Sequence, residues 1–330
     1  MSKVVVTKSK LDAINSAISA KTGMSSQRTL DGMATAIGSI SGESGALAQY
    51  RALTSGTATA LEDPTITELV DYAFYRRTNL KKISLPNLTF MGREAFRYCS
   101  SLTGFIDCPA PYGQGNGSYF RGALTKTCVL NINCMPVYTL NSCGASHLWL
   151  TGYIASCNNF FATDCANLIS IQFENVDMIK GDMLEGAVLS HMIIRQTRDV
   201  TLSFAFQSPT SSTLTVYVPA SKLSWYATAT NWSVHYNAGL IKGIDEDTLS
   251  AKGTKFTPGY SGSGVDHWDK VDLQTYSVDT NNTFDPTDGS LTPTKDGRLL
   301  IRGLDSNGGL VYCVYLKIGT GFDEEANAAS

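Results

Sequence analysis

Apolar positions in the middle of the chain recur every 22 residues. Phe74 and Phe96 are separated by 22 positions, and Leu80 and Leu102 by the same number. In the first copy an Ala-Phe pair precedes the pattern Leu-x-x-Ile-x-Leu-Pro, which predicts a short strand at residues 82–85 followed by a return segment. A period of about 20–29 residues is typical of leucine-rich solenoids, in which neighbouring copies stack because one copy cannot cover its own apolar side.

Weaker copies extend this pattern over residues 62–244, which we predict to form the solenoid. Residues 165–173 repeat the pattern of residues 99–105, whereas residues 108–117 replace the expected return segment. Three further segments are predicted as strands of degenerate copies: residues 128–133, 146–151 and 188–195. The residues predicted to fill the repeat core are Phe74, Leu80, Ile83, Leu85, Phe96, Leu102, Leu168 and Ile171.

Residues 1–40 are predicted to form a small helical module. Two apolar stripes at helical spacing are separated by Gly23, which ends the first helix, and Thr29, which caps the second. Helices this short cannot bury their apolar faces alone, so they either pack as a hairpin on their own domain or serve as a docking or oligomerisation module. The apolar residues proposed for docking are Leu11, Ile14, Ile18, Leu30, Met33 and Ile37. Residues 41–61 follow as a linker.

The C-terminal part is predicted to be a small all-β domain. Residues 245–253 are interpreted as a polar linker, and residues 254–322 as a β-sandwich whose strands are separated by Gly, Asp and Asn clusters. Residues 311–318 are largely apolar on both faces, which indicates a central strand. The predicted fold class is therefore multi-domain α+β: a helical module, a leucine-rich-repeat-like solenoid and a C-terminal sandwich.

The repeat pattern resembles the BspA-like, or LRR-5, leucine-rich repeats. Residues 216–232 resemble the last turn of such arrays, where a helix ending in an Asn-Trp pair caps the core. Residues 4–40 resemble the N-terminal modules of tail and fibre proteins in phages of Gram-positive hosts, and residues 284–299 resemble segments of β-sandwich tip domains on phage adhesins. The resemblance implies a virion protein with a docking module, a solenoid and a tip.

Composition and charge favour a binding protein. The chain has 330 residues, of which 43% are hydrophobic and only 17% charged, with a net charge of −3. This charge provides no basic excess for a nucleic-acid partner. No apolar run approaches the ~18 residues of a spanning helix, and no signal peptide is recognised, so we expect synthesis in a host cytoplasm and no membrane insertion. The eight cysteines form no Cys-x-x-Cys pair and are expected to be buried thiols.

No residue pattern indicates catalysis. The four histidines lack metal-motif spacing, and no nucleotide-binding or nucleophile motif is present. The carboxylates around His267 are interpreted as a solvated loop, and residues 285–289 as a turn. We therefore predict no enzyme activity, no cofactor and no metal.

Binding is the function that remains. Aromatic side chains at loop tips stack on sugar rings while neighbouring polar groups contact the hydroxyls. Tyr260, Trp268 and Tyr276 are the candidate ligand-binding residues. The leading hypothesis is a phage tail fibre or receptor-binding protein that adheres to a host-surface glycan or protein, joins other virion proteins through residues 1–40 and, by analogy with fibres, is a homotrimer. Alternatives are a capsid head fibre or decoration protein, a cell-surface BspA-like adhesin and a tail-associated glycan hydrolase.

Overall fold

The computed structural model describes most of the chain after residue 58. The described residues are 59–319, without 111, 114–116, 134–137, 158–159, 207–213, 250 and 274–282, together with Ser16, which lies in a helix. The predicted docking residues Leu11, Ile14, Ile18, Leu30, Met33 and Ile37 lie outside this set, as does Tyr276. The helical module and most of the linker at 41–61 therefore remain predictions.

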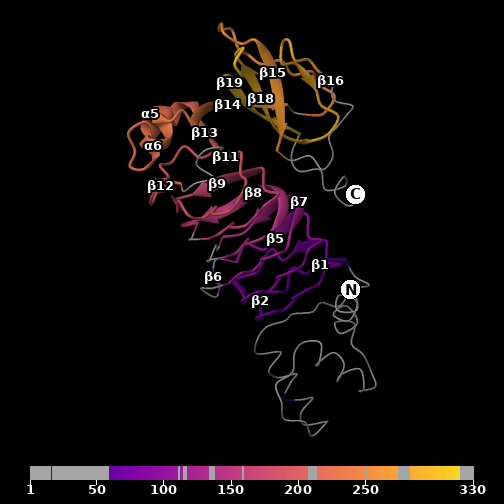
Figure 1. Cartoon of the computed structure of the whole chain (residues 1–330). Coiled ribbons are helices and arrows are strands. Elements are labelled where there is room, and N and C mark those ends of the chain that lie inside the picture. Colours follow the sequence, from indigo (N-terminus) through magenta and orange to yellow (C-terminus); the bar gives the residue numbers. More distant parts are fainter. Residues whose placement is uncertain are drawn as a thin grey trace.

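The middle of the chain is a parallel β-solenoid of about seven turns. Its strands stack in sequence order, from indigo to orange in Figure 1. These strands are β1 (Ala60–Glu62), β3 (Lys82–Ser84), β5 (Gly104–Asp107), β7 (Thr125–Asn131), β8 (Gly144–Ile154), β9 (Ser170–Val176), β11 (His191–Ile194) and β13 (Thr215–Pro219). The strands predicted for the degenerate copies are confirmed by β7, β8 and β11. The return path carries two shorter parallel ladders: β2 (Glu68–Leu69), β4 (Phe90–Met91) and β6 (Tyr112–Gly113), and β10 (Met178–Ile179) with β12 (Thr201–Leu202).

The 22-residue period places equivalent side chains on top of one another in the core. The rings of Phe74 and Phe96 lie 5.5 Å apart and those of Phe96 and Phe120 lie 5.4 Å apart, each pair at an interplanar angle of 6°. The eight residues predicted to fill the repeat core all lie in this one cluster and are at most 2% exposed. The segment 108–117 lengthens one turn without ending the stack, because Phe120 follows Phe96 by 24 residues and occupies the equivalent position.

Two short helices and a 3-10 turn close the C-terminal end of the solenoid core. They are η1 (Ala220–Lys222), α5 (Leu223–Tyr226) and α6 (Trp232–Asn237). Trp232 is fully buried, and its Nε1 donates a hydrogen bond of 2.6 Å to the carbonyl of Val200. The described part of the chain is mostly β with few helices, so the α+β class describes it only coarsely. The seven described cysteines, at positions 99, 108, 128, 143, 157, 165 and 313, are free thiols and buried.

The prediction of a polar linker at residues 245–253 is wrong. Strand β14 (Ile241–Leu249) crosses this boundary: its first half pairs with β13 and its second half pairs with β19 (Leu310–Ile318). Three consecutive acidic residues, Asp245, Glu246 and Asp247, give this segment the composition of a linker. It is a strand all the same, because hydrogen bonds to two partner strands do not depend on side-chain polarity. The solenoid sheet and the C-terminal sheet are consequently one 12-stranded sheet.

The C-terminal part is built around one antiparallel sheet, and the predicted sandwich is not confirmed. Strand β19 pairs with β18 (Gly297–Leu304), which pairs with β15 (His267–Asp272). The prediction of a central strand at residues 311–318 is confirmed, since β19 lies between β14 and β18. One sheet face packs with Phe256, Leu291 and the short pair β16 (Thr283–Phe284) and β17 (Leu291–Thr292).

The other face of this sheet packs on the solenoid. Leu300, Cys313 and Tyr315 of the C-terminal strands form one cluster with Ile193 and Tyr217, which point outward from solenoid strands β11 and β13. The C-terminal sheet therefore folds back and covers the outer side of the last turns.

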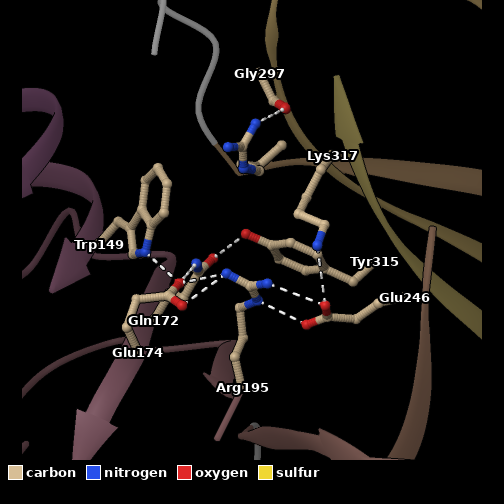
Figure 2. Close-up of polar contacts among 9 residues, drawn as sticks. Trp149, Gln172, Glu174, Arg195, Glu246, Gly297, Tyr315 and Lys317 are labelled. Atoms are coloured by element: carbon tan, nitrogen blue, oxygen red, sulfur yellow. Dashed lines mark hydrogen bonds and ion pairs between the residues drawn. The ribbon is translucent and has the colours of Figure 1, made fainter. Parts of the chain in front are cut away.

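A polar network lies beside this apolar contact (Figure 2). Arg195 on β11 donates hydrogen bonds of 2.7 Å to both carboxylate oxygens of Glu174, and of 2.8 and 3.0 Å to those of Glu246. The hydroxyl of Tyr315 donates to Oε1 of Gln172 at 2.9 Å. The Arg195 guanidinium also lies 4.6 Å from the centre of the Tyr315 ring. These contacts connect three solenoid residues to the C-terminal sheet.

Electrostatics favour the docked arrangement at neutral pH. Burial alone would raise the pKa of Glu246, but the hydrogen bonds and charges of Arg195 and Lys317 outweigh it and hold that pKa below its ordinary value. Glu246 is thus a carboxylate at pH 7 and stays paired with both cations.

Replacing Phe96 with alanine tests the stacked core. The change removes a ring that touches rings on both sides, so we expect a loss of about 3–5 kcal/mol in the free energy of unfolding. Urea denaturation followed by circular dichroism measures it. Val188→Ala is the control, because that side chain is 62% exposed, and it should change stability by less than about 0.5 kcal/mol. Equal midpoints for the two variants would contradict the shared core.

Acid should lower the free energy of unfolding through two histidines that the C-terminal sheet covers. Burial lowers the pKa of His147 and of His191, both on the covered solenoid face, from 6.5 to about 4. Below pH 6.5 the unfolded chain therefore binds protons that the folded chain does not, so stability declines as the pH falls toward 4. We expect a smaller decline in the double variant His147→Gln/His191→Gln, measured by urea midpoints across this pH window. The exposed His267, changed to Gln, should leave the decline intact.

Candidate functional site

The return loops of the solenoid share one unusual backbone conformation. Five described loops each contain two residues with positive φ, four positions apart. The pairs are Tyr72 and Arg76, Glu94 and Tyr98, Ser118 and Gly122, Tyr138 and Ser142, and Phe160 and Asp164. Non-glycine residues rarely adopt this conformation, because the Cβ atom crowds the backbone. Its recurrence shows that the stacking of the turns imposes it.

Backbone hydrogen bonds between successive turns hold these residues in the positive-φ conformation. In the first loop the N–H groups of Tyr72, Phe74 and Arg76 donate to carbonyls of the next loop, each at 2.8 Å. The same alternation recurs in the later loops. The first, fourth and fifth residues of each loop form three rows along the solenoid, and we call the surface made by these rows the return edge.

The first turns of the return edge carry arginine and tyrosine side chains in mutual contact. The guanidinium of Arg76 lies 5.2 Å from the ring centre of Tyr75 and 5.6 Å from that of Tyr98. Arg97 lies 4.6 Å from the Tyr98 ring, and its hydrogen bond and charge lower the pKa of Tyr98. Arg93 lies over Tyr72 in the same way. We call these six residues the Arg–Tyr cluster.

Further along the return edge lies a hollow of about 790 Å³. It is lined by Arg121, Tyr138, Asn141, Phe160, Thr163, Asp164, Glu185 and Gly186. The side chains of the fifth row are smaller in this stretch. Ser142, Asp164 and Gly186 occupy the positions that Arg76 and Tyr98 hold nearer the N-terminus. The rings of Tyr138 and Phe160 stack at 5.5 Å and 9° on one side of the hollow.

The polar groups of the hollow are held in place by the turns. Asn141 is 4% exposed, and its amide nitrogen donates to Oγ1 of Thr163 at 2.6 Å. Along the fourth row the side chains change from the cations Arg97 and Arg121, through Asn141 and Thr163, to the carboxylate of Glu185. The hollow therefore presents a cation at one end and carboxylates at the other, beside an aromatic wall.

The candidate ligand-binding residues predicted from the sequence lie elsewhere. Trp268 is 7% exposed and packs with Leu299 and Val314 in the core of the C-terminal sheet, which corrects its assignment to an exposed binding surface. Tyr260 is half-buried and packs on Tyr312 at 4.9 Å between ring centres. Both aromatics serve the packing of that sheet.

Sequence reasoning missed the hollow, although a signal was present. Tyr138 and Phe160 are 22 positions apart, the same offset that relates Phe74 to Phe96. The turn between Phe96 and Phe120 is two residues longer than the 22-residue period, which shifts the register of the repeat and conceals the aromatic row in the sequence. Among the described residues no group of three or more His, Cys, Asp and Glu side chains is placed to hold a metal ion. No helix in that part of the chain is long and apolar enough to cross a membrane.

Comparison with known families agrees with the repeat architecture. Residues 54–122 match the family described as BspA type Leucine rich repeat region (6 copies). Residues 54–122 thus carry leucine-rich repeats similar to the BspA type. A search of curated proteins finds no match.

Gly122→Ala tests the close packing of the return edge. A Cβ atom there would lie 2.5 Å from Cδ1 of the Tyr98 ring, and φ is +61°. Gly239→Ala is the matched control, since φ is +73° and nothing lies within 4 Å of its Cβ position. Both variants pay about 1–2 kcal/mol for the left-handed backbone. We expect a larger loss of thermal stability for Gly122→Ala, and equal losses would show that Tyr98 does not pack on Gly122.

Proposed function

We propose that this protein is a phage virion structural protein, of the tail-fibre or receptor-binding type, that attaches the particle to a host surface. The observation that supports it best is the return edge, where exposed aromatic, arginine and carboxylate side chains line up on a hydrogen-bonded stack. Tyr72 and Tyr138 are 41% and 39% exposed there, so both rings are accessible to a ligand. The resemblance of residues 4–40 to phage tail and fibre modules supplies the virion setting.

Multivalency allows weak contacts at the return edge to hold a particle on a host surface. Several copies on one particle raise the effective concentration of each further contact, so avidity exceeds the affinity of a single site. Docking through residues 1–40 and trimerisation are part of the same proposal. The rigid union of solenoid and C-terminal sheet supports it as well, because a fixed geometry reduces the entropy lost on binding.

The proposal is tested on phage particles produced by cells that encode this chain. Immunogold electron microscopy with antibodies against the chain should label the tail, and host cells preincubated with the purified full chain should adsorb fewer of these particles. Adsorption of an unrelated phage to the same cells is the control and should not change.

Other outcomes separate the alternatives. Gold on the capsid with unchanged adsorption would indicate a decoration protein. Release of reducing ends from host glycans would indicate a hydrolase. Unlabelled particles would refute the virion assignment altogether.

A further inference from the structure

The stacked pair Tyr138 and Phe160 presents a ring face to the hollow. Phe160 covers one side of Tyr138. The equivalent residue of the preceding turn is Ser118, whose short side chain cannot stack on the other side. An aromatic face bordering a hollow of this size matches the apolar face of a pyranose ring, which stacks on aromatic side chains.

Polar groups surround this platform on the side of the later turns. Asp164 and Glu185 line the hollow and provide carboxylate oxygens, which accept hydrogen bonds from hydroxyl groups. Asn141 is fixed by its hydrogen bond to Thr163, so little side-chain entropy remains to be lost when a ligand binds. An aromatic face beside fixed hydroxyl acceptors favours a sugar over a flat apolar molecule.

The side of the earlier turns is strongly basic. Residues 71–98 contain six Lys and Arg residues and two Asp and Glu residues, although the whole chain has a net charge of −3. Arg121 lines the hollow itself, at the end nearest this segment. Arg97 is balanced by Glu94 at 2.7 Å, whereas Arg76 and Arg93 lie against tyrosine rings. Cations held against aromatic faces remain available to an anion.

We propose that the hollow and the neighbouring Arg–Tyr cluster form one binding site for an acidic glycan. The glycan chain lies along the return edge: one sugar ring stacks on Tyr138, and hydroxyls of sugars on the side of the later turns donate to Asp164 and Glu185. An anionic group on the side of the earlier turns lies toward Arg121 and Arg76. A carboxylate and a phosphate both fit this chemistry, because an arginine fork binds either in a bidentate manner. The inference names the ligand class of the proposed adhesin and rests on that proposed function.

The test uses the full chain and the glycan fraction extracted from the host surface. Binding is measured by biolayer interferometry to three forms of this fraction: native, carboxyl-reduced and dephosphorylated. We expect the native form to bind, and one of the two treatments to reduce affinity at least tenfold. The effective treatment identifies carboxylate or phosphate as the anion. Unchanged affinity after both treatments would refute the inference.

Variants locate the site. Tyr138→Ala and Arg121→Gln should each reduce affinity for the native fraction at least tenfold, and Arg121→Gln should also weaken the dependence of binding on salt. Tyr153→Ala and Arg198→Gln are matched controls. They change an exposed tyrosine and an arginine 5.8 Å from its ring centre, outside the residues that line the hollow, and should bind as the parent does. Thermal unfolding checks that each variant is folded.

The outcomes also separate this inference from the proposed function. If the purified chain blocks phage adsorption but the native glycan fraction does not bind, or if Tyr138→Ala and Arg121→Gln bind as the parent does, the acidic-glycan site is refuted and the adhesin stands. If the chain neither labels particles nor blocks adsorption, the proposed function fails.

Discussion

Hydrogen bonding between successive turns is the constraint on which the rest of this structure depends. Each turn donates from its return loop to the next and shares a core in which equivalent rings stack. This arrangement holds tyrosine, arginine and aspartate in a left-handed backbone that they would not adopt alone. The exposed rows of the return edge follow from that imposed geometry, since it sets side chains from successive turns side by side.

The C-terminal sheet is also held by backbone hydrogen bonds to a neighbouring strand of the solenoid, together with side-chain contacts. Strand β14 belongs to both sheets, and the apolar contact of Tyr315 with the outer face of the solenoid is flanked by the Arg195 network. A partly buried guanidinium between two carboxylates is costly to desolvate unless every partner is in place, so this contact specifies one orientation of the two parts. The outer face of the last turns is thereby used for packing, whereas the return edge stays accessible and carries aromatic, arginine and carboxylate side chains.

The repeat, its core and the central strand of the C-terminal sheet could be predicted from the sequence. Buried positions of the repeat recur as apolar residues at a fixed spacing, as at Phe74 and Phe96, and a strand buried on both faces is a continuous apolar run, as at residues 311–318. Strand β14 could not be recognised, since its Asp and Glu residues match a solvated linker and only its two partners make it a strand. The Gly- and Asp-rich surroundings of Trp268 are typical of an exposed loop, but the turn that contains Pro286 and Gly289 packs against this residue and buries it. The hollow depends on which turn stacks on which, and the longer turn between Phe96 and Phe120 obscured that register.

The shared strand has a mechanical consequence. In β14 the two halves pair in parallel with different neighbours, β13 on one side and β19 on the other. Tension that draws the C-terminal sheet away along the strand direction would load these backbone bonds together in shear, instead of peeling them apart one at a time. Such a junction would suit the virion appendage that we propose, because rupture under load then requires many bonds to break in the same event.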